Sequence, residues 1–140
     1  MSDSITVHAT CVAIDGQAIL LRGPSGAGKS DLALRLIDRG AALVSDDYTL
    51  LTRQDDQIIA SPPATIAGKI EVRHIGIIDL PYSPEAPVRL IVDLANPPER
   101  LPQPRHEELP GVPIPVTTTS PFEAPAPTKV EWPPPRPISR

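Results

Sequence analysis

The residues with the clearest chemistry lie at positions 23–30, which read GPSGAGKS. This stretch matches G-x-x-x-x-G-K-[S/T], a glycine-rich loop whose backbone N–H groups surround a phosphate. The lysine of the pattern can reach the terminal phosphates of a nucleotide, and the serine hydroxyl can ligate Mg²⁺. An ordinary glycine-rich turn is the alternative. Because strand-like sequence precedes the loop and helical sequence follows it, the stretch predicts a phosphate site with ATP as its ligand. The residues assigned to the site are Gly23, Pro24, Ser25, Gly26, Ala27, Gly28, Lys29, Ser30 and Asp31.

Two adjacent carboxylates, Asp46 and Asp47, give the second chemical signal. They follow a short apolar run at residues 42–44. Ligands of open α/β sheets bind beyond the carboxyl ends of the parallel strands, so this pair should face the phosphate loop. One aspartate would lie near the metal, and the other would accept a proton from the incoming nucleophile. A solvated Asp-Asp turn is the alternative interpretation.

The elements that must position these groups follow from the apolar pattern of the chain. Residues 5–14 and 17–21 predict two strands joined by a hairpin turn at Asp15-Gly16. A helix should follow the loop and end at Gly40 with a left-handed C-cap. Residues 42–44 resemble a buried strand of a parallel sheet. We expect an α/β fold, a single phosphate-loop domain with a mixed sheet. Further strands are predicted at residues 50–53, 58–61, 77–80 and 88–94.

Composition limits the class of protein. A chain of 140 residues is long enough for one ordinary domain. The net charge of −4 disfavours binding to nucleic acid, which is itself a polyanion. Cys11 is the single cysteine, so no internal disulfide is expected. The sequence shows neither a secretory leader nor an apolar stretch near the ~20 residues that a membrane span needs. We therefore expect a cytoplasmic protein without a membrane partner.

Proline divides the chain, because most of its 20 prolines lie at or after Pro97. Proline lacks an N–H and has a fixed φ, which disfavours both helix and central strand. We place the folded unit at residues 4–118. Residues 119–140 are predicted to form an extended, proline-rich and mostly disordered tail.

A family resemblance rests on four segments in order. They are Val7-His8-Ala9, the glycine-rich loop, the Asp46-Asp47 pair, and residues 71–79, which read EVRHIGIID. Together they resemble the catalytic domain of bacterial HPr kinase/phosphorylase, the serine kinase of the sugar phosphotransferase system. The resemblance covers roughly residues 5–118 and implies a short form without the family's usual N-terminal domain.

The resemblance implies a role for each matching residue. Lys29 would hold the phosphates, and Mg²⁺ would lie at Ser30 and Glu71 near Asp46. Asp47 would be the base that takes the proton from a serine hydroxyl. Two further residues, His8 and Arg100, match site positions of the family, and the charge of Arg100 could stabilise the transferring phosphoryl group. The implied substrates are ATP and an HPr-like phosphocarrier protein. The resemblance also allows for a homo-oligomer.

The sequence also departs from the family pattern. Asp31 stands where a glutamate is common, and His74 replaces a glycine. The family's basic, glycine-containing loop, needed for dephosphorylation, corresponds here to residues 114–121, which contain neither a basic residue nor a glycine. We expect Arg105, in proline-rich sequence, not to be held rigidly enough to replace that charge. Weak or absent phosphorylase activity follows as the expectation.

Two other functions stay open at this point. A small-molecule kinase of the shikimate or gluconate type also pairs a phosphate loop with early aspartates, but it needs a helical, arginine-bearing lid. A nucleotide-sensing module without phosphotransfer would keep Lys29 and Ser30 and have no use for a base at Asp47.

Overall fold

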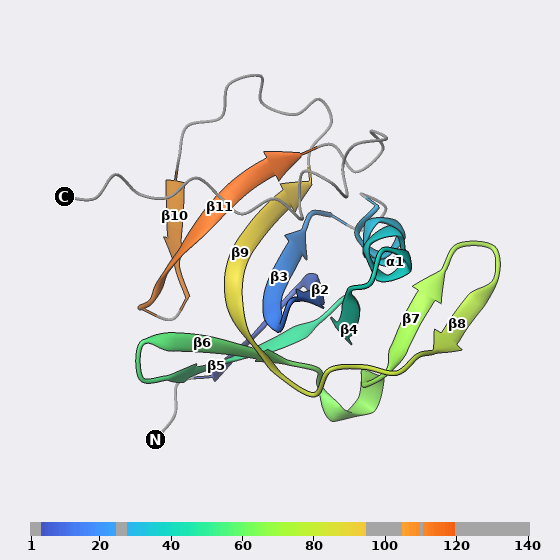
Figure 1. Cartoon of the computed structure of the whole chain (residues 1–140), viewed down its shortest axis with the longest axis horizontal. Helices are drawn as coiled ribbons and strands as arrows, with labels where there is room; N and C mark the ends of the chain where they lie inside the picture. Colours follow the sequence, from blue (N-terminus) through green and yellow to red (C-terminus); the bar gives the residue numbers. More distant parts are fainter. Residues whose placement is uncertain (1–3, 25–27, 95–104, 110, 120–140) are drawn as a thin grey trace.

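The structure, a computed structural model, describes residues 4–24, 28–94, 105–109 and 111–119. These residues form a strongly curled mixed sheet of nine strands, one α-helix packed against it, and a separate two-stranded hairpin (Figure 1). This is the mixed α/β class that the sequence predicts. Among the described residues, no helix has the length and apolar character needed to cross a membrane. The elements are β1 (Ser4–Val7), β2 (Ala9–Ile14), β3 (Gln17–Arg22), α1 (Lys29–Asp38), β4 (Ala42–Ser45), β5 (Thr49–Gln54), β6 (Gln57–Ser61), the 3-10 helix η1 (Ala64–Ile66), β7 (Lys69–Val72), β8 (Gly76–Asp79), β9 (Ala86–Leu94), β10 (Arg105–Glu108) and β11 (Pro113–Thr119).

The strand order explains how the loop after β3 is placed. Along the sheet the strands run β1-β5-β6-β9-β3-β2-β4, with β11 beside β9 and β10 beside β11. β3 is parallel to β9, and β9 is parallel to β11, so their carboxyl ends share one edge of the sheet. The glycine-rich loop leaves β3 at this edge and leads into α1 (Figure 1).

Local sequence accounts for the turn before the loop and for the end of the helix. Asp15 and Gly16 have φ of 52° and 78°, as a two-residue type I′ hairpin turn requires. Gly40 has φ of 111° after the last turn of α1. Its N–H bonds to the Ile37 carbonyl at 3.0 Å, and the Ala41 N–H bonds to the Leu36 carbonyl at 3.0 Å, which is the Schellman pattern. The predicted hairpin turn and helix end are both confirmed.

The predicted strand at residues 5–14 is wrong as a single element. It breaks at His8, so that β1 pairs with β5 while β2 pairs with β3 and β4. The predicted strand–helix–strand unit also differs, because β2 lies between β3 and β4. β3 and β4 run in the same direction, yet each is antiparallel to the intervening strand. β2, the hairpin partner of β3, occupies the position beside β3 that β4 would take after a simple crossover.

Three strands, β7, β10 and β11, were not expected from the sequence. The last of them contains Pro113 and Pro115, in the region where proline should disfavour a strand. Over residues 113–115 β11 pairs only with β10, and its pairing with β9 begins at Val116. Prolines are tolerated where one edge of a strand is unpaired, because the missing N–H then breaks no ladder. β11 extends to Thr119, the first residue of the predicted tail, and residues 120–140 lie outside the described residues.

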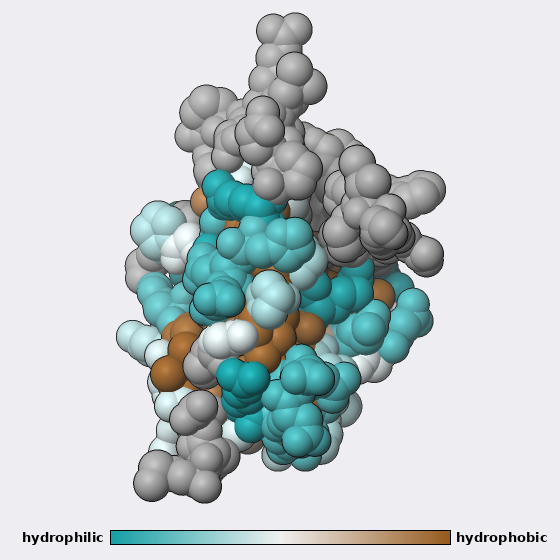
Figure 2. All heavy atoms as spheres, turned by 90° about the vertical axis from the view of Figure 1, so that its left-hand side faces the viewer, coloured by the Kyte–Doolittle hydropathy of each residue, from teal (hydrophilic) through white to brown (hydrophobic). Residues whose placement is uncertain are grey.

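The core occupies both faces of the sheet. Alternate residues of β3 divide between them, with Ile19 and Leu21 facing α1 and Leu20 facing the opposite side. Leu32 and Leu36 bury the apolar stripe of α1 against the first face. The curl of the sheet brings β5, β6 and β11 over the second face. Seen from the side of β10 and the β5–β6 hairpin, hydrophilic side chains border an apolar patch (Figure 2).

Candidate active site

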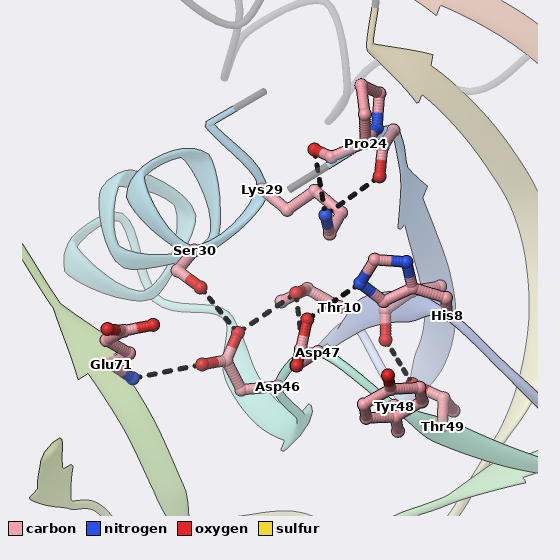
Figure 3. Close-up of polar contacts among 12 residues, drawn as sticks. His8, Thr10, Pro24, Lys29, Ser30, Asp46, Asp47, Tyr48, Thr49 and Glu71 are labelled. Atoms are coloured by element: carbon pink, nitrogen blue, oxygen red, sulfur yellow. Dashed lines mark hydrogen bonds and ion pairs between the residues drawn. The ribbon is translucent and has the colours of Figure 1, made fainter. Parts of the chain in front are cut away.

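The start of α1 places Lys29 against the beginning of the loop. Gly28, directly before the helix, has φ of 96°, which favours glycine. The Lys29 side chain is only 6% exposed, and its Nζ donates to the carbonyl oxygens of Gly23 at 2.8 Å and Pro24 at 3.2 Å (Figure 3). The ammonium therefore lies against the first residues of the loop and beside the N-terminus of α1, where an anion is favoured. Ser25, Gly26 and Ala27 lie outside the described residues, so their assignment stays a prediction.

Asp46 is the centre of a buried hydrogen-bond network. It is 7% exposed and directly follows Ser45, the last residue of β4. Its Oδ1 accepts from Ser30 Oγ at 2.6 Å and from Thr10 Oγ1 at 2.9 Å, while Oδ2 accepts from the Glu71 N–H at 2.9 Å. Figure 3 shows these donors converging from β2, α1 and β7. Three hydrogen bonds offset the cost of burying an ionised carboxylate.

The donor set suits a hard divalent cation. Ser30 gives its proton to Asp46, which leaves the hydroxyl lone pairs directed elsewhere and able to ligate a cation. The exposed Glu71 side chain adds carboxylate oxygens beside it. Within the described ranges, no group of three or more His, Cys, Asp or Glu side chains is arranged to hold a metal. Few protein ligands are what Mg²⁺ needs, because it keeps several waters and binds substrate phosphates as well. The predicted residues therefore fit Mg²⁺.

Asp47 points away from this buried network and toward His8. Its side chain is 57% exposed, and its Oδ1 lies 2.8 Å from His8 Nε2. The His8 ring in turn lies against Tyr48, with ring centroids 5.1 Å apart. Asp47 has φ of 70°, a left-handed conformation that is uncommon for residues other than glycine. The two aspartates thus have different environments, one buried and saturated with hydrogen bonds, the other open to an incoming group.

The structure therefore brings together most of the residues singled out from the sequence. His8, Lys29, Ser30, Asp46, Asp47 and Glu71 lie in one region between the loop and β7 (Figure 3). Asp31 is exposed in the first turn of α1. Arg100 lies outside the described residues, so its role stays a prediction. His74, where the family pattern has glycine, takes φ of 69° in the β7–β8 turn, so this position does demand a left-handed backbone.

Sequence reasoning missed Thr10, which contacts both aspartates. It is fully buried in β2. Besides its bond to Asp46, its Oγ1 accepts from the Asp47 N–H at 3.1 Å. The available signal was a hydroxyl within an otherwise apolar strand, two residues after His8.

A second set of charges lies beside the loop. Arg22, the last residue of β3, makes a bidentate pair with Asp93 of β9 at 2.7 and 3.1 Å and contacts Glu107 of β10 at 2.6 Å. The hydrogen bonds that Arg22 donates to Asp93 raise the pKa of Arg22 further above its usual value. Arg105 also bonds to Asp93, at 2.6 Å. The expectation that Arg105 is not held rigidly is wrong, because it belongs to β10 and has a carboxylate partner.

Known proteins of one family are similar to this chain. Residues 1–97 match the HPr Serine kinase C-terminal domain family. The HPr kinase/phosphorylase of Mycoplasmopsis pulmonis is 35% identical over 99 residues, 66% of this chain and 32% of that protein. That of Clostridium botulinum is 45% identical over 74 residues, 53% of this chain and 24% of the relative. The chain thus spans 32% or less of the length of these two relatives.

A solved structure supports the fold over nearly the whole chain. The Hpr(Ser) kinase/phosphatase from Coxiella burnetii matches with a TM-score of 0.80 and 33% sequence identity. The match covers 91% of this chain and 86% of that one. The curled mixed sheet with few helices is therefore shared between the two.

Proposed function

This chain belongs to the HPr Serine kinase C-terminal domain family, and we propose that it is an ATP-dependent protein serine kinase acting on an HPr-like phosphocarrier. The observation that carries the proposal is the difference between the environments of Asp46 and Asp47. One is buried against the loop serine, and the other is exposed and oriented by a histidine. A site that only bound a nucleotide would need the first arrangement without the second.

Nucleotide binding is assigned to the loop and the start of α1. Backbone N–H groups and the helix N-terminus favour the phosphate anions, and Lys29 can exchange its carbonyl partners for phosphate oxygens. Ser30, with Asp46 accepting its proton and Glu71 nearby, would hold Mg²⁺. The bound ion would neutralise charge that develops on the transferring phosphoryl group.

Phosphotransfer is assigned to Asp47. The carrier's serine oxygen forms a bond to the γ-phosphorus of ATP while the bond from that phosphorus to the β,γ-bridging oxygen breaks, which releases ADP. The serine proton passes to Asp47 as general base. His8 contacts Oδ1 of this carboxylate, so the proposal assigns the proton to Oδ2. Arg100 would stabilise the charge on the transferring group.

Labelled ATP distinguishes the three candidate functions. Incubation with Mg-ATP and an HPr-type carrier should move the γ-phosphate to a serine of the carrier. Transfer to a small alcohol such as shikimate or gluconate would favour the small-molecule kinase, which needs a helical lid, whereas α1 is the only α-helix within the described ranges. Binding without transfer to any acceptor would indicate a sensing module.

We also propose that phosphate-dependent dephosphorylation is weak or absent. This reaction must bring inorganic phosphate close to a phosphoserine, at a Coulomb cost that basic residues would have to offset. Residues 114–119 lie in β11 and carry no basic side chain, and the charges of Arg22 and Arg105 are already matched by Asp93 and Glu107. Offering the phosphorylated carrier with phosphate and no nucleotide should release little pyrophosphate. Efficient release would refute this part of the proposal.

A further inference from the structure

We propose that Thr10 is a positioning residue that orients Asp47 for phosphotransfer, an inference that rests on the function proposed for Asp47. Thr10 is fully buried in β2, and its single hydroxyl bridges the two aspartates. This hydroxyl contacts the side chain of Asp46 and the backbone N–H of Asp47. Its effect on the reaction would therefore pass through the second aspartate without any contact to a substrate.

The β2–β4 pairing brings Thr10 opposite the aspartates. Val12 pairs with Leu43, but Cys11 pairs with Ser45, so one extra residue of β4 is accommodated between them as a bulge. Without this bulge the antiparallel register would place Ser45, and not Asp46, across from Thr10. Bulges commonly re-aim side chains beside active sites. Here the bulge sets the end of β4 back by one residue along β2, so that Asp46 lies across from Thr10 and not from Ala9.

The direction of each hydrogen bond follows from the chemistry of the partners. The Asp46 carboxylate can only accept, so the Thr10 hydroxyl must give it its one proton, over 2.9 Å. The hydroxyl oxygen is then left with lone pairs, one of which accepts from the Asp47 N–H at 3.1 Å. Asp46 thus fixes the rotation of the hydroxyl, and the hydroxyl fixes the backbone of Asp47. Asp46 itself keeps two other donors, Ser30 Oγ and the Glu71 N–H, if Thr10 is lost.

Asp47 needs this support because its backbone is held in a costly conformation. A φ of 70° lies in the left-handed region, which crowds the Cβ against the following carbonyl oxygen and which residues other than glycine adopt uncommonly. Thr10 holds the residue at its N–H, and His8, two positions earlier in the chain, holds the carboxylate at 2.8 Å. His8, just before β2, and Thr10, within it, therefore hold Asp47 at two points. Losing one of them would let the carboxylate move relative to the serine that it must deprotonate.

The test compares Thr10→Val, which keeps the branched shape, with Thr10→Ser, which keeps the hydroxyl. Thr10→Val should lower kcat about 10- to 100-fold, since a displacement of about 1 Å at a reacting group has an effect of this size. The KM for Mg-ATP should change less than about threefold, because Asp46 remains held. Thr10→Ser should restore most of kcat. An unchanged kcat in Thr10→Val, or no recovery in Thr10→Ser, would overturn the proposal. Should Thr10→Val fail to fold, Thr10→Ala and Thr10→Ser give the same comparison.

A double-mutant cycle separates this proposal from the function on which it rests. If Thr10 acts through Asp47, Thr10→Val should have little further effect on the residual rate of Asp47→Asn. Independent, multiplicative losses would show that Thr10 acts by another route and would refute the inference. Full activity in Asp47→Asn alone would instead refute the general-base assignment, whatever Thr10→Val does in the parent.

Discussion

Replacing Asp46 with asparagine tests the role given to the buried carboxylate. The substitution keeps the size of the side chain but exchanges one of its two accepting oxygens for an NH₂ donor. In the parent, Oδ2 accepts from the backbone N–H of Glu71, and Oδ1 accepts from the hydroxyls of Ser30 and Thr10. The backbone N–H cannot reverse its direction, whereas both hydroxyls can rotate. The new amide oxygen should therefore face Glu71, and its NH₂ should face the hydroxyls.

The magnitude follows from what this reversal does to Ser30. Its hydroxyl would accept from the new amide instead of giving its proton to a carboxylate, so one lone pair that the proposal assigns to Mg²⁺ would be occupied. The loss of one charge-assisted hydrogen bond is about 1.5–3 kcal/mol. Because 1.4 kcal/mol corresponds to a tenfold change in an equilibrium constant, the Mg²⁺ concentration for half-maximal activity should rise about 10- to 100-fold.

The assay is a Mg²⁺ titration of ATP-dependent phosphotransfer at fixed nucleotide, with circular dichroism to show that the variant is folded. Asp38→Asn is the matched control, because it removes the same charge from the exposed last turn of α1, at the opposite end of the helix from the loop. The control should shift the titration less than about twofold, since an exposed charge is largely screened. If Asp46→Asn titrates like the parent, Asp46 does not organise the metal site and the reasoning fails.

Three further predictions concern the loop, the charges beside it and the buried thiol. Lys29→Ala should weaken binding of Mg-ATP in calorimetry at least tenfold, and equal affinity would contradict the phosphate-loop assignment. Arg22→Leu should lower the free energy of unfolding in urea by roughly 1–3 kcal/mol, whereas breaking the exposed Lys69–Asp79 pair with Lys69→Met should cost less than about 1 kcal/mol. Burial raises the pKa of the Cys11 thiol well above its usual range, so stability should fall as the pH rises above about 8.5, where the unfolded thiol ionises first. Cys11→Ala should show a shallower fall between pH 8.5 and 10, and identical profiles would count against a buried thiol.

Local sequence was sufficient for the parts of the site that depend on local geometry. Gly28, Lys29 and Ser30 follow from a motif whose backbone conformation and helix start are encoded within a few residues. Gly40 and the Asp15-Gly16 turn likewise act through their own φ angles. The position of Asp46 beside the loop serine could also be anticipated, because the end of the strand after the helix must return to the same edge of the sheet.

The remaining parts depend on pairings between distant strands, which the sequence does not display. Thr10 faces Asp46 because of the bulge between β2 and β4, and His8 reaches Asp47 because the first strand breaks there and changes partners. Arg22 meets Asp93 because their strands pair in parallel with these two residues in register. A count of prolines likewise could not show which edge of β11 is unpaired.

The account as a whole is tested most directly by one comparison of the parent protein with Asp47→Asn. Each is mixed with Mg-ATP and an HPr-type carrier in a single turnover, and the modified residue and rate are read by mass spectrometry while nucleotide affinity is measured separately. We predict phosphoserine on the carrier, a rate lower by roughly 10²-fold or more in Asp47→Asn, and a similar Kd for Mg-ATP in both proteins. An equal rate in the two proteins, or no phosphoserine with the parent, would contradict the assignment of this site as a serine kinase with Asp47 as its base.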